Sequence, residues 1–196
     1  METDHMFMDA DTLRSAFDQG LSYAGFVQAG EPGHQHQWHE RYGQLELDAR
    51  QIEVVRGFGR TMKVLCLTGQ WCGDCALQGA ALQRIAEAAG ERIDLRFIPR
   101  SDDFAELIVA NRINEGYRVP MAWLMAEDFH PCARFGDRTL SRYRSMARKA
   151  LGDAAPVIAD APDDPVRTVL AEVLDEVERV QLLLRLSPRL REVHGD

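Results

Sequence analysis

Long apolar runs are missing from this sequence, because no stretch of about 18 residues is apolar enough to cross a bilayer. The beginning, Met1-Glu2-Thr3-Asp4-His5, also lacks the basic and apolar regions of a secretory signal. Basic residues are outnumbered, with 23 Lys and Arg against 31 Asp and Glu and a formal net charge of −8. This balance argues against nonselective nucleic-acid binding, which needs a basic face. We therefore expect a cytoplasmic protein whose partners are small molecules or proteins, with no nucleic acid and no membrane among them.

Cysteine is also scarce, and four residues cannot form the dense disulfide framework of a small secreted protein. Cys66 and Cys132 lie in apolar or strand-like segments, so we expect them in the core. Cys72 and Cys75 are different, because only two residues separate them. In a reducing compartment such a pair is more often catalytic or metal-binding than structural.

The 196 residues, 45% hydrophobic and 28% charged, are sufficient for one substantial core with additions. We divide the chain into a helical extension over 1–60, a core over 61–152, and a linker with a C-terminal helix over 153–196. Within the extension, apolar residues recur at helical spacing in two stripes, and each stripe predicts one helix. The first contains Leu13, Phe17, Leu21 and Ala24, and the second Trp38, Tyr42, Leu45, Ala49 and Ile52.

A β-α-β unit is predicted at the centre of the chain. Residues 62–67 and 93–98 have the pattern of strands, and residues 76–89 have the pattern of a helix between them. Such a crossover makes its two strands parallel. The segment Trp71-Cys72-Gly73-Asp74-Cys75 then lies at the carboxyl end of the first strand, where open α/β sheets usually form their sites.

Further elements are predicted on the C-terminal side. Residues 117–126 and 132–135 fit an antiparallel hairpin, and a helix over 139–151 is expected to cover it. Asp164 and Pro165 then begin a last helix. The apolar stripe along this helix, its seam, could pair with a second copy in a dimer or cover the protein's own sheet. We favour packing on the protein's own sheet and expect a monomer or a weak dimer. The seam consists of Val166, Leu170, Val173, Val177, Val180 and Leu184.

The position of the two central cysteines favours redox chemistry without a cofactor. A helix N-terminus carries partial positive charge and free backbone N–H groups, which favour ionisation of a thiol there. Cys72 would stand at the entry of the helix and Cys75 one turn further in. A mixed disulfide formed on Cys72 can then be resolved by Cys75.

These features together resemble the thioredoxin family, particularly its bacterial branch with Gly-Asp between the cysteines. The resemblance rests on the Trp71–Cys75 motif within a β-α-β unit, the Val119-Pro120 step into a hairpin, and Gly136 after the last strand. It covers roughly residues 61–150. It implies an α/β, thioredoxin-like fold in which a central mixed sheet is flanked by helices, with an N-terminal helical extension and a C-terminal helix added.

The resemblance also implies roles for individual residues. Cys72 would be the nucleophile and Cys75 the resolving thiol. Pro120 would be a cis proline beside them, and the backbone of Val119 would pair with an extended substrate. Trp71 would contact substrate as well, and the site-supporting residues would be Trp71, Gly73, Asp74 and Pro120.

Two residues depart from the usual thioredoxin pattern. Asp74 stands where a proline is common, and its charge should oppose thiolate formation and make the pair more reducing. Cys66 stands where a buried aspartate handles protons. Proton removal from Cys75 would then depend on water or on another group.

We therefore expect a thiol-disulfide oxidoreductase that acts on a disulfide-containing protein or small thiol and is reduced again by a reductase or thiol pool. The alternatives are a redox-inactive thioredoxin-fold binding module and half of a zinc site. For His34, His36 and His39 we favour a polar loop that caps the second helix over metal binding, and we assign no metal. Three arginines flank the expected site and could select an acidic partner, although solvated side chains are the more common outcome: Arg100, Arg112 and Arg118.

Overall fold

The computed structural model of the chain describes residues 8–154 and 162–196. Its centre is a four-stranded sheet with the strand order β2-β1-β3-β4. β1 and β2 are parallel, whereas the other neighbouring pairs are antiparallel, which confirms the predicted β-α-β unit and hairpin. The strands are β1 (Met62–Thr68), β2 (Ile93–Pro99), β3 (Met121–Ala126) and β4 (Pro131–Gly136).

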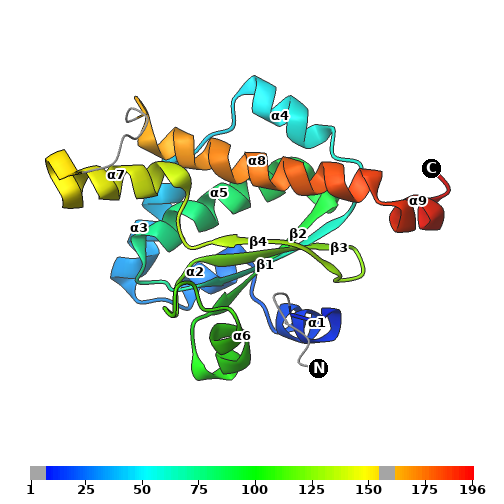
Figure 1. Ribbon diagram of the computed structural model, residues 1–196, viewed down its shortest axis with the longest axis horizontal. Helices are drawn as coiled ribbons and strands as arrows, with labels where there is room; N and C mark the ends of the chain where they lie inside the picture. Colours follow the sequence, from blue (N-terminus) through cyan, green and yellow to red (C-terminus); the bar gives the residue numbers. More distant parts are fainter. Residues whose placement is uncertain (1–7, 155–161) are drawn as a thin grey trace.

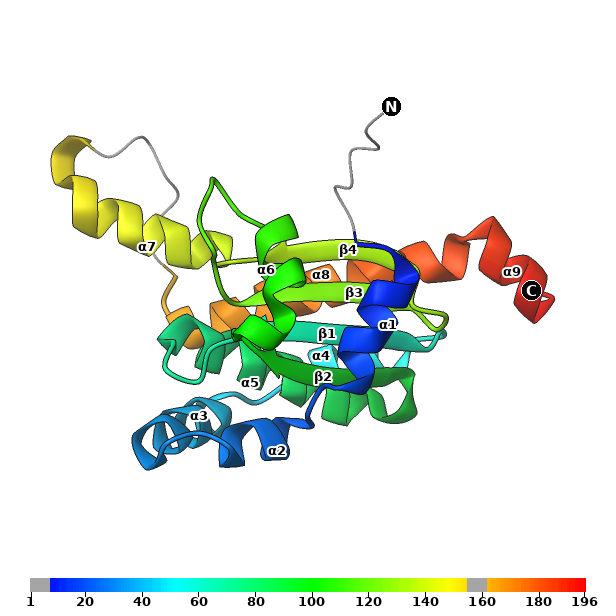
Figure 2. The same ribbon diagram turned by 90° about the horizontal axis from the view of Figure 1, so that it is seen from below.

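Helices cover both faces of this sheet (Figures 1 and 2). α5 (Gly73–Ala89) and α8 (Pro165–Leu186) lie on one face, and α1 (Ala10–Asp18) and α6 (Ala105–Ala110) lie on the other. This three-layer arrangement is the predicted α/β class with helices added at both ends. Four shorter elements extend the main helices: η1 (Gly90–Arg92), η2 (Asp102–Phe104), η3 (Gly152–Ala154) and α9 (Pro188–His194).

The single helix predicted from Leu13 to Ala24 is wrong, because the chain forms α1 and then α2 (Tyr23–Gln28). Between them Leu21 makes an isolated bridge with Phe97 on β2, with N···O distances of 2.8 and 2.9 Å in the two directions. A Cβ on Gly20 would lie 2.6 Å from the Cβ of Arg96, so the close approach to β2 depends on a glycine. Pairing with the sheet edge thus interrupts the helical stripe.

The second stripe is also divided, into α3 (Pro32–Gln44) and α4 (Ala49–Arg56). Asp48 begins α4 with a capping box, in which its side chain accepts from the Gln51 backbone N–H and the Gln51 side chain accepts from the Asp48 N–H. Leu45 is fully buried at the break. The apolar spacing therefore continued across a point where local capping changes the chain direction.

Helix α7 (Leu140–Leu151) does not cover the hairpin as predicted, because Ser141 is its only buried residue. α8 fills that place instead and packs against α5, β3 and β4. The seam residues Leu170, Val173, Val177, Val180 and Leu184 are buried, while Val166 is partly buried. In the expected linker, residues 155–161 lie outside the described residues, as do residues 1–7 at the beginning. Within 8–154 and 162–196, no helix has the length and apolar character needed to cross a membrane.

Candidate active site

Cys72 and Cys75 meet at the first turn of α5, directly after the end of β1. Cys72 is the N-cap residue of the helix, and its Sγ accepts a hydrogen bond from the Cys75 backbone N–H at 3.3 Å. Cys72 is half-buried and Cys75 is fully buried, and neither is in a disulfide. Cys72 is therefore the more accessible of the two thiols, with Cys75 behind it.

The surroundings shift the pKa values of the two thiols in opposite directions. The pKa of Cys72 is lowered to about 7, chiefly by a hydrogen bond with the Cys75 side chain, while burial and the Asp74 charge oppose this effect. The pKa of Cys75 is raised, chiefly by burial and then by its interaction with Cys72. The arrangement therefore holds one thiol that ionises near neutral pH beside one that keeps its proton.

The Val119-Pro120 step lies beside these thiols. The peptide bond between the two residues is cis, as the resemblance implies. The Cys72 thiol lies 3.9 Å from the Val119 carbonyl oxygen, to which it donates. Gly136 packs against the same segment, because a Cβ there would lie 2.4 Å from the Pro120 oxygen. Gly136 also has a φ of +145°, which favours glycine.

Trp71 stands at the surface next to Cys72, with 56% of its area exposed. Its ring lies over Gly69, where an added Cβ would come within 2.7 Å of it. Gly73, the first residue of α5, faces α3, because its Cβ position lies 3.4 Å from the Gln37 side-chain nitrogen. An exposed aromatic ring beside a half-buried thiol is suited to contact with another protein.

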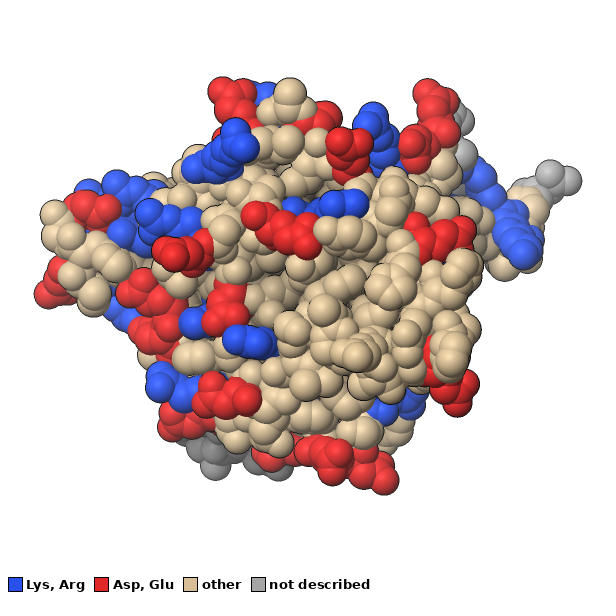
Figure 3. All heavy atoms as spheres, turned by 180° about the vertical axis from the view of Figure 1, so that it is seen from behind, with Lys and Arg blue, Asp and Glu red and all other residues tan. Residues whose placement is uncertain are grey.

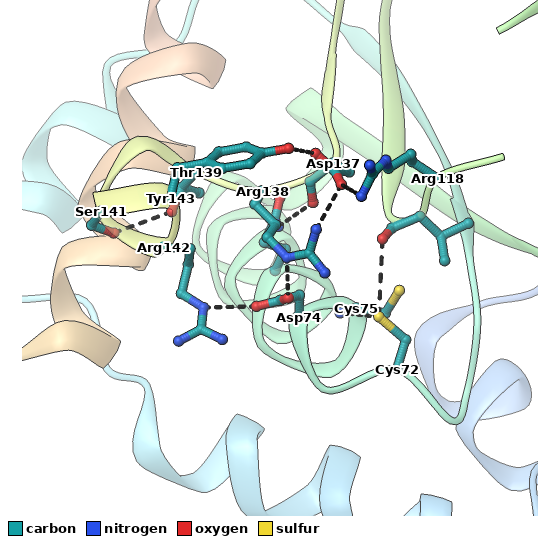
Figure 4. A network of polar contacts seen from close by, with 12 residues as sticks. Cys72, Asp74, Cys75, Arg118, Asp137, Arg138, Thr139, Ser141, Arg142 and Tyr143 are labelled. Atoms are coloured by element: carbon teal, nitrogen blue, oxygen red, sulfur yellow. Dashed lines mark hydrogen bonds and ion pairs between the residues drawn. The ribbon is translucent and has the colours of Figure 1, made fainter. Parts of the chain in front are cut away.

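The carboxylate of Asp74 is paired with two arginines beside the thiols. Its carboxylate accepts from Arg138 Nε and from Arg142 Nε, each at 2.7 Å (Figure 4). Arg138 comes from the segment after β4, and Arg142 comes from α7. The negative charge still raises the pKa of Cys72, but as a minor cause. The charge of Asp74 thus acts in the predicted direction, and two arginines pair with it.

The same network continues to a buried carboxylate, Asp137. It accepts from Arg138 Nη1 at 2.8 Å and from the Tyr143 hydroxyl, and it pairs with Arg118 at 3.6 Å (Figure 4). The sequence analysis did not identify Asp137, Arg138, Arg142 or Tyr143. No local pattern marks them, since Arg138 and Arg142 follow Asp74 by 64 and 68 positions.

The N-terminal helices hold the turn that precedes Cys72. Fully buried Trp38 on α3 donates from Nε1 to the Gln70 carbonyl oxygen at 2.9 Å. The Gln70 side chain in turn donates to the Phe26 carbonyl of α2 at 2.6 Å. The N-terminal extension thus helps to hold the turn before Cys72 in place. Figure 3 views the protein from behind, the side on which α2 and α3 lie, and shows a broad area with few charged side chains.

The other candidates of the sequence analysis lie apart from the thiols or serve in local contacts. Arg118 joins the network above, Arg112 pairs with Glu115 at 2.5 Å, and the Arg100 backbone N–H donates to the Thr68 carbonyl at 2.9 Å. The predicted polar loop at His34, His36 and His39 is wrong, because all three lie within α3, which begins at Pro32. Among the described residues, no three His, Cys, Asp or Glu side chains are grouped so that they could hold a metal ion.

The remaining two cysteines have different environments. Cys66 is fully buried, as predicted, and burial raises its pKa to about 12. Cys132 is only partly buried on β4, where its thiol donates to the His130 carbonyl oxygen at 3.4 Å. The expectation of a core position therefore holds for Cys66 and is only partly met by Cys132.

Comparisons with known proteins add a family and a fold. Residues 20–149 match the model of a family described as thioredoxin. No curated protein matches the chain. A crystal structure of a protein of unknown function from Pseudomonas aeruginosa is similar, with a TM-score of 0.64 and 22% identity over 85% of this chain and 97% of that one. An HIV epitope-scaffold is also similar, with a TM-score of 0.59 and 22% identity over 83% and 97%.

At this identity the two solved structures establish the fold alone. The family match is wider than the resemblance found in the sequence, which covers residues 61–150. It begins at residue 20 and thus includes α2, α3 and α4. The matched region therefore includes α2 and α3, which hydrogen-bond with the turn before Cys72.

Proposed function

This chain belongs to the thioredoxin family, and on that basis we propose that it is a thiol-disulfide oxidoreductase. Cys72 and Cys75 are the proposed reacting pair, and no cofactor takes part. The substrate is a disulfide in a protein or a small thiol, and a reductase or thiol pool restores the dithiol. We place this activity in the cytoplasm, where the surrounding thiols are kept reduced, and we propose a monomer or weak dimer.

The proposed reaction has two steps. The Cys72 thiolate attacks one sulfur of the substrate disulfide and forms a mixed disulfide, and the displaced thiolate takes up a proton. Cys75 then loses its proton and attacks Cys72 Sγ, which forms the Cys72–Cys75 disulfide and releases the second substrate thiolate. That thiolate is also protonated. Two thiols of the protein are oxidised and the two sulfurs of the substrate are reduced, so electrons and protons balance.

The observation that carries this proposal is the first turn of α5. Cys72 is accessible at the N-cap and accepts from the Cys75 backbone N–H at 3.3 Å, while Cys75 is fully buried behind it. Lowering of the Cys72 pKa to about 7 supports attack near neutral pH. The order of attack follows from access, because a bulky substrate meets Cys72 before Cys75.

The neighbouring residues have supporting roles in this proposal. The backbone of Val119, next to Pro120, pairs with an extended substrate chain. Trp71 contributes an exposed ring to the same contact. Gly73 and Asp74 complete the turn, and the arginines that bind Asp74 limit the effect of its charge on the thiols.

A redox titration with controlled ratios of reduced and oxidised dithiothreitol tests the proposal. Alkylation followed by mass analysis of peptides should show a reversible two-electron transition that joins Cys72 to Cys75. In a parallel reaction with glutathione disulfide, Cys72→Ser should abolish disulfide reduction, whereas Cys75→Ser should retain a Cys72–glutathione mixed disulfide. Cys132→Ser is the matched control and should titrate like the unaltered protein. If no Cys72–Cys75 disulfide forms at any ratio, the redox proposal is wrong and a binding module takes its place.

A further inference from the structure

A buried hydroxyl without a partner lies at the end of β1. Thr68 is fully buried, and within the described residues its Oγ1 has no hydrogen-bond partner. An unpaired buried hydroxyl costs free energy, because the hydrogen bonds it made with water are lost. Such a group calls for an explanation in terms of either a ligand or a second state of the protein.

Thr68 is close to the resolving thiol. The turn Gly69–Trp71 folds back on β1, and the Cys72 backbone N–H donates to the Gly69 carbonyl oxygen at 3.1 Å. This brings the first turn of α5 over the end of the strand. Thr68 directly precedes Gly69, and the Cys75 backbone N–H donates to Cys72 Sγ at 3.3 Å, so the Thr68 hydroxyl and the buried Cys75 both lie where β1 meets α5. The Thr68 hydroxyl also lowers the pKa of Cys75. In the reduced protein, however, the hydroxyl has no hydrogen-bond partner of ordinary geometry within the described residues.

The buried thiol needs such a donor at one stage of the proposed reaction. Burial holds the Cys75 pKa high, yet Cys75 must become a thiolate before it can attack the mixed disulfide. Two further titratable groups lie near the thiol pair, Cys66 on β1 and Asp74 on α5, and both interact with Cys72. Burial keeps Cys66 protonated, since its pKa is raised to about 12, and Asp74 is engaged by two arginines. Neither is suited to stabilise a charge on Cys75.

We propose that the Thr68 hydroxyl donates a hydrogen bond to the Cys75 thiolate during resolution of the mixed disulfide. A thiol is a weak acceptor, whereas a thiolate is a strong one, so the hydroxyl gains its partner only when the charge forms. The hydroxyl keeps its own proton, and the proton of Cys75 leaves to water and is balanced by the one that the released substrate thiolate takes up. This inference rests on the proposed dithiol function and assigns a residue to its second step.

Thr68→Val is the direct test, because valine has nearly the same shape and lacks the hydroxyl. The reduced protein is mixed with glutathione disulfide, quenched with acid over time from pH 6 to 9, and analysed by mass. In the variant, the Cys72–glutathione mixed disulfide should accumulate, and its conversion to the Cys72–Cys75 disulfide should slow by about 10- to 100-fold near pH 7. The pH at which resolution reaches half its maximum should rise. Thr68→Ser, which keeps the hydroxyl, should restore both.

A purely structural role predicts a different result. Urea unfolding of Thr68→Val should show equal or greater stability, since the substitution removes an unpaired polar group. If valine prevents folding, Thr68→Ala and Thr68→Ser provide the same comparison with and without the hydroxyl. Resolution at the unaltered rate in the variants without the hydroxyl overturns the Thr68 inference and leaves the dithiol function intact. Absence of any Cys72–Cys75 disulfide in the unaltered protein overturns both.

Discussion

Replacement of Asp74 by asparagine should make Cys72 more acidic. The carboxylate lies on the same helical turn as both cysteines, and its charge raises the pKa of Cys72. Asparagine keeps the size of the side chain and removes that charge. Arg138 and Arg142, which each bind the carboxylate at 2.7 Å, would then face the site with less negative charge to balance them. The loss of the negative charge and the less balanced positive charge of the two arginines both favour the Cys72 thiolate.

The expected size of this effect follows from Coulomb's law. Side chains two positions apart on a helical turn place their charged atoms roughly 7 Å apart. At that distance two unit charges interact by about 2 kcal/mol with an effective dielectric constant of about 20. The arginines already offset part of the Asp74 charge, so we expect about 1 kcal/mol to be recovered. This corresponds to about a fivefold increase in the acid ionisation constant of Cys72.

The assay is the alkylation rate of Cys72 as a function of pH, read by peptide mass. With the pKa of Cys72 at about 7 in the unaltered protein, about one tenth of it is thiolate at pH 6. In Asp74→Asn about one third should be thiolate, so alkylation at pH 6 should be roughly three- to fourfold faster. The two proteins should react at similar rates at pH 9, where the thiolate predominates in both.

Asp94→Asn is a matched control for this experiment. Asp94 also pairs with two cations, Lys63 at 2.9 Å and Arg96 at 3.4 Å, but it lies beside the first residues of β1, at the opposite end of the strand from the thiols. Its alkylation curve should coincide with that of the unaltered protein. An Asp74→Asn curve that is unmoved, or displaced to higher pH, would refute the electrostatic reasoning.

Three further predictions concern stability. Gly136→Ala should lower the free energy of unfolding in urea by about 3 kcal/mol, since its Cβ would meet a backbone oxygen at 2.4 Å and φ is +145°; a loss below about 1 kcal/mol would contradict this. Trp38→Phe should cost about 2 kcal/mol and alter the Cys72 alkylation rate. Trp123→Phe is the control, because the buried Nε1 of Trp123 has no hydrogen-bond partner within the described residues. It should leave the Cys72 alkylation rate unchanged and remove no hydrogen bond. Arg189 lowers the pKa of Asp128 to about 2, so this pair stabilises the fold above about pH 4 and loses its effect as pH falls toward 2. Asp128→Asn should therefore reduce the loss of Tm between pH 4 and 2, and an unchanged slope would count against the pair.

The amino-acid sequence determined the central β-α-β unit and the place of the two thiols, because both follow from local patterns. Strand 62–67 is an almost continuous apolar run, the cysteines stand at the start of the following helix, and Gly90 ends that helix with a positive φ of +57°, which favours glycine. The Val119-Pro120 step could be identified in the same way. These features depend on residues that are neighbours in the chain.

Tertiary structure decided what depends on distant partners. The first helical stripe is broken because Leu21 pairs with Phe97 across the edge of the sheet. The electrostatic setting of Asp74 depends on Arg138 and Arg142, which hydrogen-bond to it from positions 64 and 68 residues away. No periodicity in the sequence encodes such contacts, since they form only when β4 and α7 are placed beside α5. The proposed chemistry of the thiols was thus indicated by one short motif, whereas the charged groups around them were placed only by the packing of the whole fold.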